Sequence, residues 1–279
     1  MAAQPATDYR IYADLADWWP LISPPKDYTA EAAYLAAILR HHAGPGPAGP
    51  GPAAPAGPRP AGPAGPGGLP EVLDLGSGGG HVAVHLRDEF SLTLVDLSNQ
   101  MLTVSKQLNP DSPHIHGDMR TIRLHRMFDA VLVHDAIDYI IGQDDLRQVI
   151  DTAAAHTRPG GIALFVPDYV QDTFHELFGS GGGGVDAAGR TADFTERTWD
   201  PDLGDDCVQA DYEFRLVEAD GTTRVIHESH QLSSFSRELW RDLIKRAGFE
   251  LADWPTPATG HQSATGQPAN LFIGLKQPQ

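Results

Sequence analysis

One stretch of the chain, VLDLGSGGGHVAVHL at residues 72–86, constrains the fold more than any other. Its apolar start runs into the loop Gly76 to Gly80, and an amphipathic segment follows. A buried strand, a glycine turn and a helix in this order are typical of the first unit of a parallel α/β sheet. Ligands bind such sheets beyond the carboxyl ends of the strands, where glycine lets the backbone approach a ligand closely.

Strand-like and helix-like patterns alternate along most of the chain. Predicted strands cover residues 71–75, 91–96, 114–117, 128–133, 162–167, 249–254 and 270–276. Predicted helices cover residues 80–88, 98–106, 143–157 and a segment that ends at Gly248. Near-continuous apolar strands separated by helices indicate a parallel sheet that is covered on both faces. We therefore expect an α/β fold with a Rossmann-like, seven-stranded, mostly parallel sheet and helices on both faces.

The chain divides by composition into three parts. Residues 44–68 contain only Gly, Pro, Ala and one Arg, so we expect a disordered linker over 44–70. An N-terminal helical cap or lid at 1–43 precedes it, and the main domain at 71–279 follows. The segments 207–217 and 222–233 predict an antiparallel hairpin, within a small antiparallel β insertion at about 190–235. We expect the main domain to stay folded without residues 1–30 and to lose turnover.

Bulk properties exclude several classes of protein. The formal net charge of −17 argues against a nucleic-acid partner, because phosphate binding needs clustered Lys and Arg. No stretch approaches the ~18 consecutive apolar residues of a membrane span. Cys207 is the only cysteine, which excludes an internal disulfide and any Cys-rich metal site, and we expect no metal. No secretory signal is visible, so the sequence indicates a cytoplasmic protein.

Two carboxylates flank the glycine loop. Asp74 precedes the loop, and Asp96 ends the second predicted strand, where a carboxylate can accept hydrogen bonds from ribose hydroxyls. In the dinucleotide pattern G-x-G-x-x-G the third glycine would fall where His81 stands. Asp74 would repel a pyrophosphate but suits an ammonium group. An NAD(P)-dependent oxidoreductase is therefore the less favoured interpretation.

These motifs resemble those of class I S-adenosylmethionine (SAM)-dependent methyltransferases. VLDLGSGGG is similar to their first motif, LTLVDLSNQML (92–102) to the second and HGDMRTI (116–122) to the third. The order of PGGIALFVPD (159–168), TWDPD (198–202) and FSRELWRDLIKRAGF (235–249) resembles that in actinobacterial small-molecule methyltransferases. The segments KDYTAEA (26–32) and PDYVQDTF (167–174) resemble amino-sugar N,N-dimethyltransferases.

The resemblance implies SAM as the cofactor and S-adenosylhomocysteine as its product. Asp118 would then accept a hydrogen bond from the adenine amino group, and Met119 would line the ring. The expected cofactor-binding residues are Asp74, Gly76, Ser77, Gly78, Asp96, Leu97, Met101, Asp118, Met119, His134, Tyr12 and Trp19.

The acceptor side is expected after the fourth strand, on the N-terminal cap and in the β insertion. Asp135 or His230 is the candidate base or substrate orienter, because of its position and because an imidazole titrates near neutrality. The expected substrate contacts are Asp138, Tyr139, Asp168 and Tyr169. His227 and His230 lie three residues apart, so on a strand they face opposite sides and form a poor pair of metal ligands.

The chain is thus expected to transfer a methyl group to an oxygen or nitrogen of a small molecule, such as a natural-product or amino-sugar intermediate. The alternative is a non-catalytic SAM-binding protein. Formation of a homodimer is left open.

Overall fold

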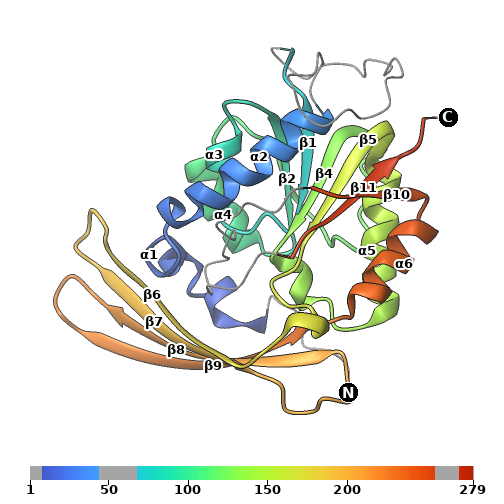
Figure 1. The fold of residues 1–279 in the computed structure, drawn as a ribbon. Helices are drawn as coiled ribbons and strands as arrows, with labels where there is room; N and C mark the ends of the chain where they lie inside the picture. Colours follow the sequence, from blue (N-terminus) through green and yellow to red (C-terminus); the bar gives the residue numbers. More distant parts are fainter. Residues whose placement is uncertain (1–7, 44–67, 255–269, 279) are drawn as a thin grey trace.

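The computed structural model describes residues 8–43, 68–254 and 270–278. Most of the predicted 44–70 linker lies outside the described residues. The described chain forms two β-sheets, with helices on the first sheet and an N-terminal segment against the second (Figure 1).

The first sheet has seven strands, as predicted, and their order is β10-β11-β5-β4-β1-β2-β3. All neighbouring strands pair in parallel except those on either side of β11. The strands are β1 (Glu71–Leu75), β2 (Ser91–Asp96), β3 (His114–His116), β4 (Phe128–His134), β5 (Thr157–Val166), β10 (Phe249–Ala252) and β11 (Phe272–Lys276). After β1 the chain continues to β2 and β3 on one side, whereas β4 and β5 lie on the other. The carboxyl ends of β1 and β4 therefore flank a topological switch point, where ligands bind in open α/β sheets.

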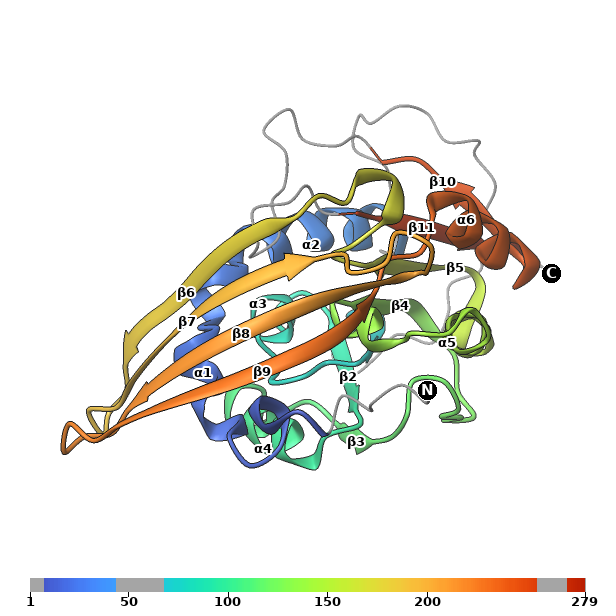
Figure 2. The same cartoon turned by 90° about the horizontal axis from the view of Figure 1, so that it is seen from below.

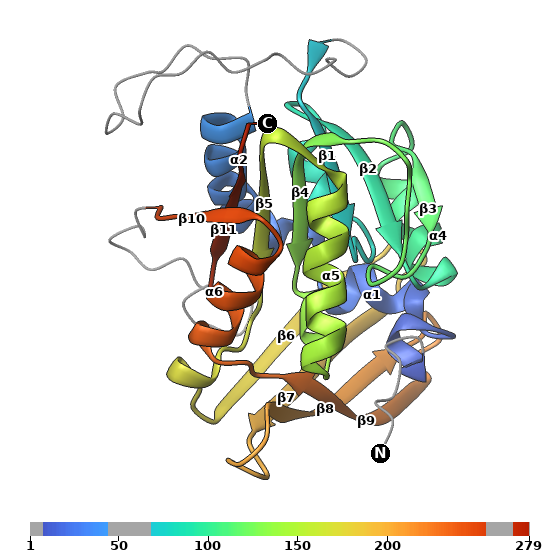
Figure 3. The same cartoon turned by 90° about the vertical axis from the view of Figure 1, so that its right-hand side faces the viewer.

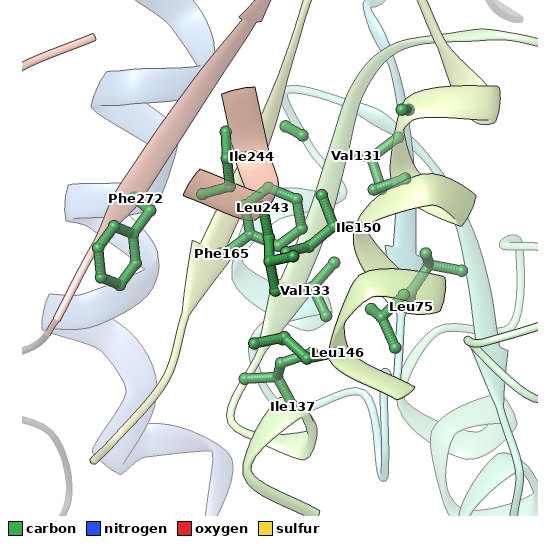
Figure 4. Packing of buried hydrophobic residues seen from close by; sticks show 14 of the residues in the cluster. Leu75, Val131, Val133, Ile137, Leu146, Ile150, Phe165, Leu243, Ile244 and Phe272 are labelled. Carbon is green, nitrogen blue, oxygen red and sulfur yellow. The ribbon is translucent and has the colours of Figure 1, made fainter. Parts of the chain in front are cut away.

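Helices cover both faces of this sheet. The main helices are α2 (Thr29–Ala43), α3 (Ala83–Leu86), α4 (Asn99–Leu108), α5 (Gln143–His156) and α6 (Arg237–Arg246). Helices α5 and α6 pack on one face (Figure 3), where Val133, Ile150 and Ile244 belong to one buried cluster (Figure 4). Helices α2 and α3 contribute Leu39 and Leu86 to the cluster on the opposite face. The core holds the strand ends rigidly at the switch point.

The second sheet is antiparallel, with strands in the order β6-β7-β8-β9. Its strands are β6 (Leu177–Val185), β7 (Thr191–Trp199), β8 (Cys207–Val217) and β9 (Thr223–Ser233). The hairpin of β8 and β9 matches the prediction, with Gly221 at φ 86° in its turn. Strands β6 and β7 were not predicted, and β6 begins before residue 190. This sheet lies below the first one in Figure 1 and in front of it in Figure 2, which is seen from below.

The N-terminal segment fills the space between the second sheet and α4. It contains η2 (Arg10–Tyr12), η3 (Ala16–Trp18), α1 (Trp19–Ile22) and η4 (Pro25–Tyr28). Ile11 and Trp18 are buried in one cluster with Phe214 and Leu216 of β8. The segment supplies six of the nine buried residues of this cluster, so we now predict, in place of a removable lid, that the second sheet needs the segment to fold.

Two elements differ in length from their predictions. Helix α3 is shorter than the predicted 80–88, because Gly80 has φ 73° and cannot belong to a right-handed helix. Strand β5 begins at Thr157 rather than at residue 162, since Thr157 pairs with Phe128 ahead of a bulge.

Candidate functional site

A cavity opens at the carboxyl ends of β1, β2, β4 and β5. The second sheet and the N-terminal segment form its other walls. The residues that line it are Tyr12, Trp19, Ile22, Ser23, Tyr28, Asp74, Gly76, Ser77, Gly78, Gly79, His81, Val82, Asp96, Leu97, Ser98, Met101, His134, Asp135, Ala136, Asp138, Tyr139, Asp168, Tyr169, Phe194, Glu196, Tyr212, Phe214, His230 and Leu232.

The loop after β1 presents backbone and one carboxylate to the cavity. Gly76 has φ 82°, and a Cβ atom there would lie 2.6 Å from the Cβ of Ala136, so only glycine fits. Gly78 has φ 53° and also lines the cavity. Asp74 is 5% exposed, and burial raises its pKa to about 7 although His134 lowers it. Among the described residues, no group donates a hydrogen bond to this carboxylate, which leaves it available to a cationic ligand.

Asp96 ties the glycine loop to helix α4. Its carboxylate accepts hydrogen bonds from the backbone N–H of Gly78 and of Ser98, both at 2.7 Å. Ser98 is the N-cap of α4, as predicted, because its Oγ accepts from the N–H of Met101 at 3.1 Å. The same hydroxyl donates to the carbonyl of Tyr12 at 2.6 Å. Two neighbouring strand ends and the N-terminal segment are therefore fixed around this part of the cavity.

An ionic cluster lies at the end of β4. His134 Nε2 is 3.0 Å from Glu31 Oε1 of α2 and 3.2 Å from Asp135 Oδ1. Burial alone lowers the pKa of His134, but the carboxylates of Asp135 and Glu31 outweigh it and raise the pKa to about 10. The three groups offer ligand atoms within 4.8 Å of one another, a spacing compatible with a metal ion. The imidazolium of His134 itself satisfies the two carboxylates.

Asp135 is held in a strained backbone conformation. It has φ 44° and ψ −55°, which costs a non-glycine residue roughly 1–3 kcal/mol. Its N–H donates to the carbonyl of Val166 at 3.1 Å, and its carbonyl accepts from the N–H of Asp138 at 2.9 Å. Burial raises the pKa of its carboxyl group to about 7. Such strain persists where surrounding structure imposes it, and it frequently marks functional positions.

Two further aspartates, the buried Asp138 and the partly buried Asp168, face the cavity beyond β4 and β5. One Asp138 oxygen, Oδ2, accepts from the N–H of Asp168 at 2.8 Å, whereas Oδ1 has no hydrogen-bond partner among the described residues. Burial raises the pKa of both carboxyl groups well above the usual value. On the second sheet, Glu196 accepts from the hydroxyls of Tyr169 and Tyr212 at 3.2 and 3.3 Å. This end of the cavity is therefore strongly acidic.

The second sheet contributes His230 to the same cavity. His230 is 1% exposed, and its Nδ1 lies 2.8 Å from the hydroxyl of Tyr139. His227 points the other way, with 72% of its side chain exposed. The two histidines thus face opposite sides of β9, as their spacing predicted.

The structure brings together nearly all of the proposed site residues. Asp118 and Met119 are the exceptions, since neither lines the cavity. Arg120 holds the Asp118 carboxylate at 2.6 Å, so an ion pair occupies the oxygens that were expected to meet adenine. Met119 instead packs under the glycine loop, with its Cε 2.8 Å from the position of a Cβ on Gly76.

Sequence reasoning missed several residues of the site. Glu31 and His81 come from the N-terminal part and the glycine loop, and Glu196 and Tyr212 come from the second sheet. Burial lowers the pKa of His81 to about 4, so its ring is neutral. The segment KDYTAEA contains both Tyr28 and Glu31, and it was the one available signal for this wall.

Residues 72–161 match a family model described as a methyltransferase domain, and this match spans β1 to β5 and the cavity loops. The chain carries a SAM-dependent methyltransferase domain.

The similarity of this methyltransferase to curated relatives extends beyond the matched domain. It is 28% identical over 270 residues to the dTDP-3-amino-3,6-dideoxy-alpha-D-glucopyranose N,N-dimethyltransferase of Streptomyces fradiae, covering 95% of this chain and 94% of the relative. It is 33% identical over 105 residues to the dTDP-3-amino-3,4,6-trideoxy-alpha-D-glucopyranose N,N-dimethyltransferase of Streptomyces venezuelae, covering 37% and 44%.

Solved structures share the fold of this methyltransferase. Streptomyces venezuelae DesVI has a TM-score of 0.72 at 22% identity, covering 95% of this chain and 98% of the other. SAM-bound CalS10, an amino pentose methyltransferase from Micromonospora echinaspora, has a TM-score of 0.66 at 23% identity, covering 90% and 92%. None of these comparisons favours an oxidoreductase or a non-catalytic protein. Within the described ranges, no helix has the length and apolar character needed to span a bilayer.

Proposed function

We propose that this methyltransferase modifies the amino nitrogen of an amino sugar. The acidity of the cavity carries the proposal: Asp135, Asp138 and Glu196 line it, and no Lys or Arg does so among the described residues. These carboxylates outnumber the imidazolium of His134, and a low-dielectric cavity with such an excess of one charge concentrates ligands of the opposite sign. An amine arrives as an ammonium ion, whereas a neutral hydroxyl gains nothing from this field. The full-length similarity to an amino-sugar N,N-dimethyltransferase supports the same acceptor class.

The residues at the switch point fit SAM. Gly76 and Gly78 line the cavity and have positive φ values that favour glycine, and Asp74 is a buried carboxylate to which no described residue donates a hydrogen bond. In our proposal Asp74 holds the α-ammonium group, and Asp96 holds the ribose hydroxyls. Ser77, Leu97, Met101, His134, Tyr12 and Trp19 complete the pocket. When bound, SAM supplies an electrophilic methyl group at its sulfonium.

Asp135 is the proposed orienting residue for the acceptor. Its strained backbone directs the carboxylate into the cavity. His134, which also pairs with Glu31, lies 3.2 Å from this carboxylate. We propose that Asp138, Tyr139, Asp168 and Tyr169 line the acceptor beside it. The aromatic wall formed by Tyr12 and Trp19 excludes water from the site, which strengthens the attraction between carboxylate and ammonium.

The test offers the purified protein SAM together with dTDP-linked amino sugars and their hydroxyl analogues. We expect S-adenosylhomocysteine release and a mass gain of one or two methyl groups with the amino sugars alone. Comparable methylation of a hydroxyl analogue, or no methylation of any amine, would contradict the proposal.

A matched pair of variants locates the acceptor end. Asp135→Asn is expected to raise KM for the amine by about tenfold or more, because a charge-assisted contact is lost. SAM affinity should not change. Asp144→Asn, at a position that is 94% exposed on α5, serves as the control and should behave as wild type.

A further inference from the structure

A chain of hydrogen bonds leads from the cavity wall into the second sheet. The hydroxyls of Tyr12 and Tyr139 are 2.9 Å apart, and the Tyr139 hydroxyl is 2.8 Å from His230 Nδ1. The other ring nitrogen of His230, Nε2, is 3.1 Å from Glu228 Oε2. Tyr12 comes from η2, Tyr139 from η6 (Ala136–Tyr139), and His230 and Glu228 from β9. Four side chains from three elements therefore form one continuous path.

Glu228, at the end of this path, sets which group of each hydrogen bond is the donor. An ionised carboxylate only accepts hydrogen bonds, so Nε2 of His230 donates to Glu228. If the ring carries a single proton, Nδ1 is then the acceptor, and the hydroxyl of Tyr139 donates to it. The Tyr139 oxygen in turn accepts from Tyr12. All donors point from the cavity toward Glu228, which leaves an oxygen lone pair of Tyr12 available on the cavity side.

The aromatic side chains around His230 keep this path ordered and add no charge to it. The ring of Tyr9 stacks on the imidazole of His230 with centroids 3.8 Å apart, and the ring of Tyr212 lies at 4.8 Å. Burial raises the pKa of each of the tyrosines that face His230, namely Tyr9, Tyr12, Tyr139 and Tyr212. Glu228 is thus the carboxylate in contact with this imidazole. Its other oxygen accepts from the backbone N–H of Arg10 at 2.7 Å.

We propose that Tyr12, Tyr139, His230 and Glu228 form a proton relay that serves the acceptor nitrogen. The inference rests on the proposed N-methylation. An amine that has gained a methyl group is an ammonium ion, and it must lose a proton before its lone pair can react a second time. In the relay the N–H bond breaks and its electron pair stays on nitrogen, while the proton bonds to the oxygen of Tyr12.

The remaining transfers balance without any further reactant. Tyr12 passes its own hydroxyl proton to Tyr139, and Tyr139 passes its proton to Nδ1 of His230. Both tyrosines end neutral, and the imidazolium stands next to the carboxylate of Glu228. The three groups thus move one positive charge from the acceptor nitrogen to the imidazole of His230, which is the terminal base.

The first test reads the ring of His230 directly. Nitrogen-15 NMR of the ligand-free protein, with the His230 signals assigned by their absence in His230→Gln, is expected to show the Nε2–H tautomer. Tyr139→Phe should alter the Nδ1 signal, because its hydrogen-bond donor is gone. An Nδ1–H tautomer in the wild type would overturn the relay whatever the activity.

The second test follows methylation. His230→Gln and Glu228→Gln are expected to lower kcat for the second methylation by about 10- to 100-fold at neutral pH, with little change in KM for the amine. Monomethylated product should then accumulate, and the loss should shrink at alkaline pH, where the free amine predominates. His227→Gln, on the exposed face of the same strand, is the control.

The outcomes separate the two proposals. Wild-type kcat and an unchanged ratio of mono- to dimethylated product in His230→Gln would overturn the relay alone. Absence of amine methylation by the wild type would overturn the proposed function, and the relay with it.

Discussion

Replacing Asp74 by asparagine tests two effects of its buried charge: the stability that the charge costs the folded protein, and the SAM binding that we propose it supports. The carboxylate is 5% exposed at the end of β1, and burial raises its pKa to about 7. Its nearest compensating charge is that of His134, which lowers the pKa only in part. Asparagine keeps the shape of the side chain and removes the charge.

The magnitude follows from the pKa. A pKa of about 7 lies about three units above the 3.8 of a solvated aspartate. At about 1.4 kcal/mol per unit, this difference corresponds to about 4 kcal/mol. Because the pKa of this acid rises on folding, the folded ligand-free protein binds the proton more tightly, and stability falls as pH rises from about 4 to about 7. Asparagine does not ionise, so Asp74→Asn does not lose stability in this pH range. We expect it to be more stable than wild type by roughly 2–4 kcal/mol at pH 8, and equally stable at pH 4.

Two measurements on the same variant decide the matter. Urea denaturation of the ligand-free protein at both pH values gives the stability difference. Calorimetric titration with SAM at pH 8 should show binding about 10- to 100-fold weaker than in wild type, because an ionic hydrogen bond to the ammonium group is lost.

A buried aspartate outside the cavity supplies the control. Asp129, at the start of β4, pairs with Arg158 rather than lining the cavity. Asp129→Asn should lower stability, since a buried ion pair is broken, and leave SAM affinity unchanged. The reasoning fails if Asp74→Asn is no more stable than wild type at pH 8, or if it binds SAM with full affinity.

Three further changes test other parts of the structure. Ser98→Ala should lower the free energy of unfolding by about 1 kcal/mol and weaken SAM binding, whereas Ser236→Ala, at the N-cap of α6, should lower stability alone; equal SAM affinities would contradict this. His134 has a pKa raised from 6.5 to about 10, so its stabilisation is full below about 6.5 and is lost as pH rises through about 10. His134→Gln should therefore be less stable by roughly 2–4 kcal/mol at pH 7 in urea denaturation, and the difference should fade above pH 10. Removal of residues 1–30 should abolish cooperative thermal unfolding, and a sharp wild-type-like transition would show that the second sheet folds without its partner.

Local signals made much of the fold predictable. Apolar runs identified the strands of the first sheet, and the caps at Ser98 and Gly248 identified helix ends, because these patterns depend on neighbouring residues. The Asp220-Gly221 pair identified the hairpin for the same reason. The carboxylates at the ends of β1 and β2 followed from topology, since the carboxyl ends of parallel strands meet at one edge.

Other features depend on contacts that no local pattern encodes. Residues 179–184 read GSGGGG, a composition typical of loops, yet they belong to edge strand β6. The structure gives a reason at Gly181, where a Cβ would lie 2.6 Å from the ring of Phe194, so the small residue makes room for an aromatic neighbour. Likewise, Glu31 meets His134 only because α2 packs across the sheet.

The cofactor side of the cavity is easier to predict from the sequence than the acceptor side. The cofactor side is built from loops directly after parallel strands, so their order in the chain places Asp74 and Asp96 together. The acceptor side combines Asp135 with Glu196 and His230, which reach it only because the second sheet docks on the N-terminal segment. Substitutions on the second sheet can therefore reshape the acceptor wall without moving the loops after β1 and β2 that are assigned to SAM. We expect acceptor preference among related chains to vary mainly with β7, β8 and β9, and SAM affinity to depend on the loops after β1 and β2.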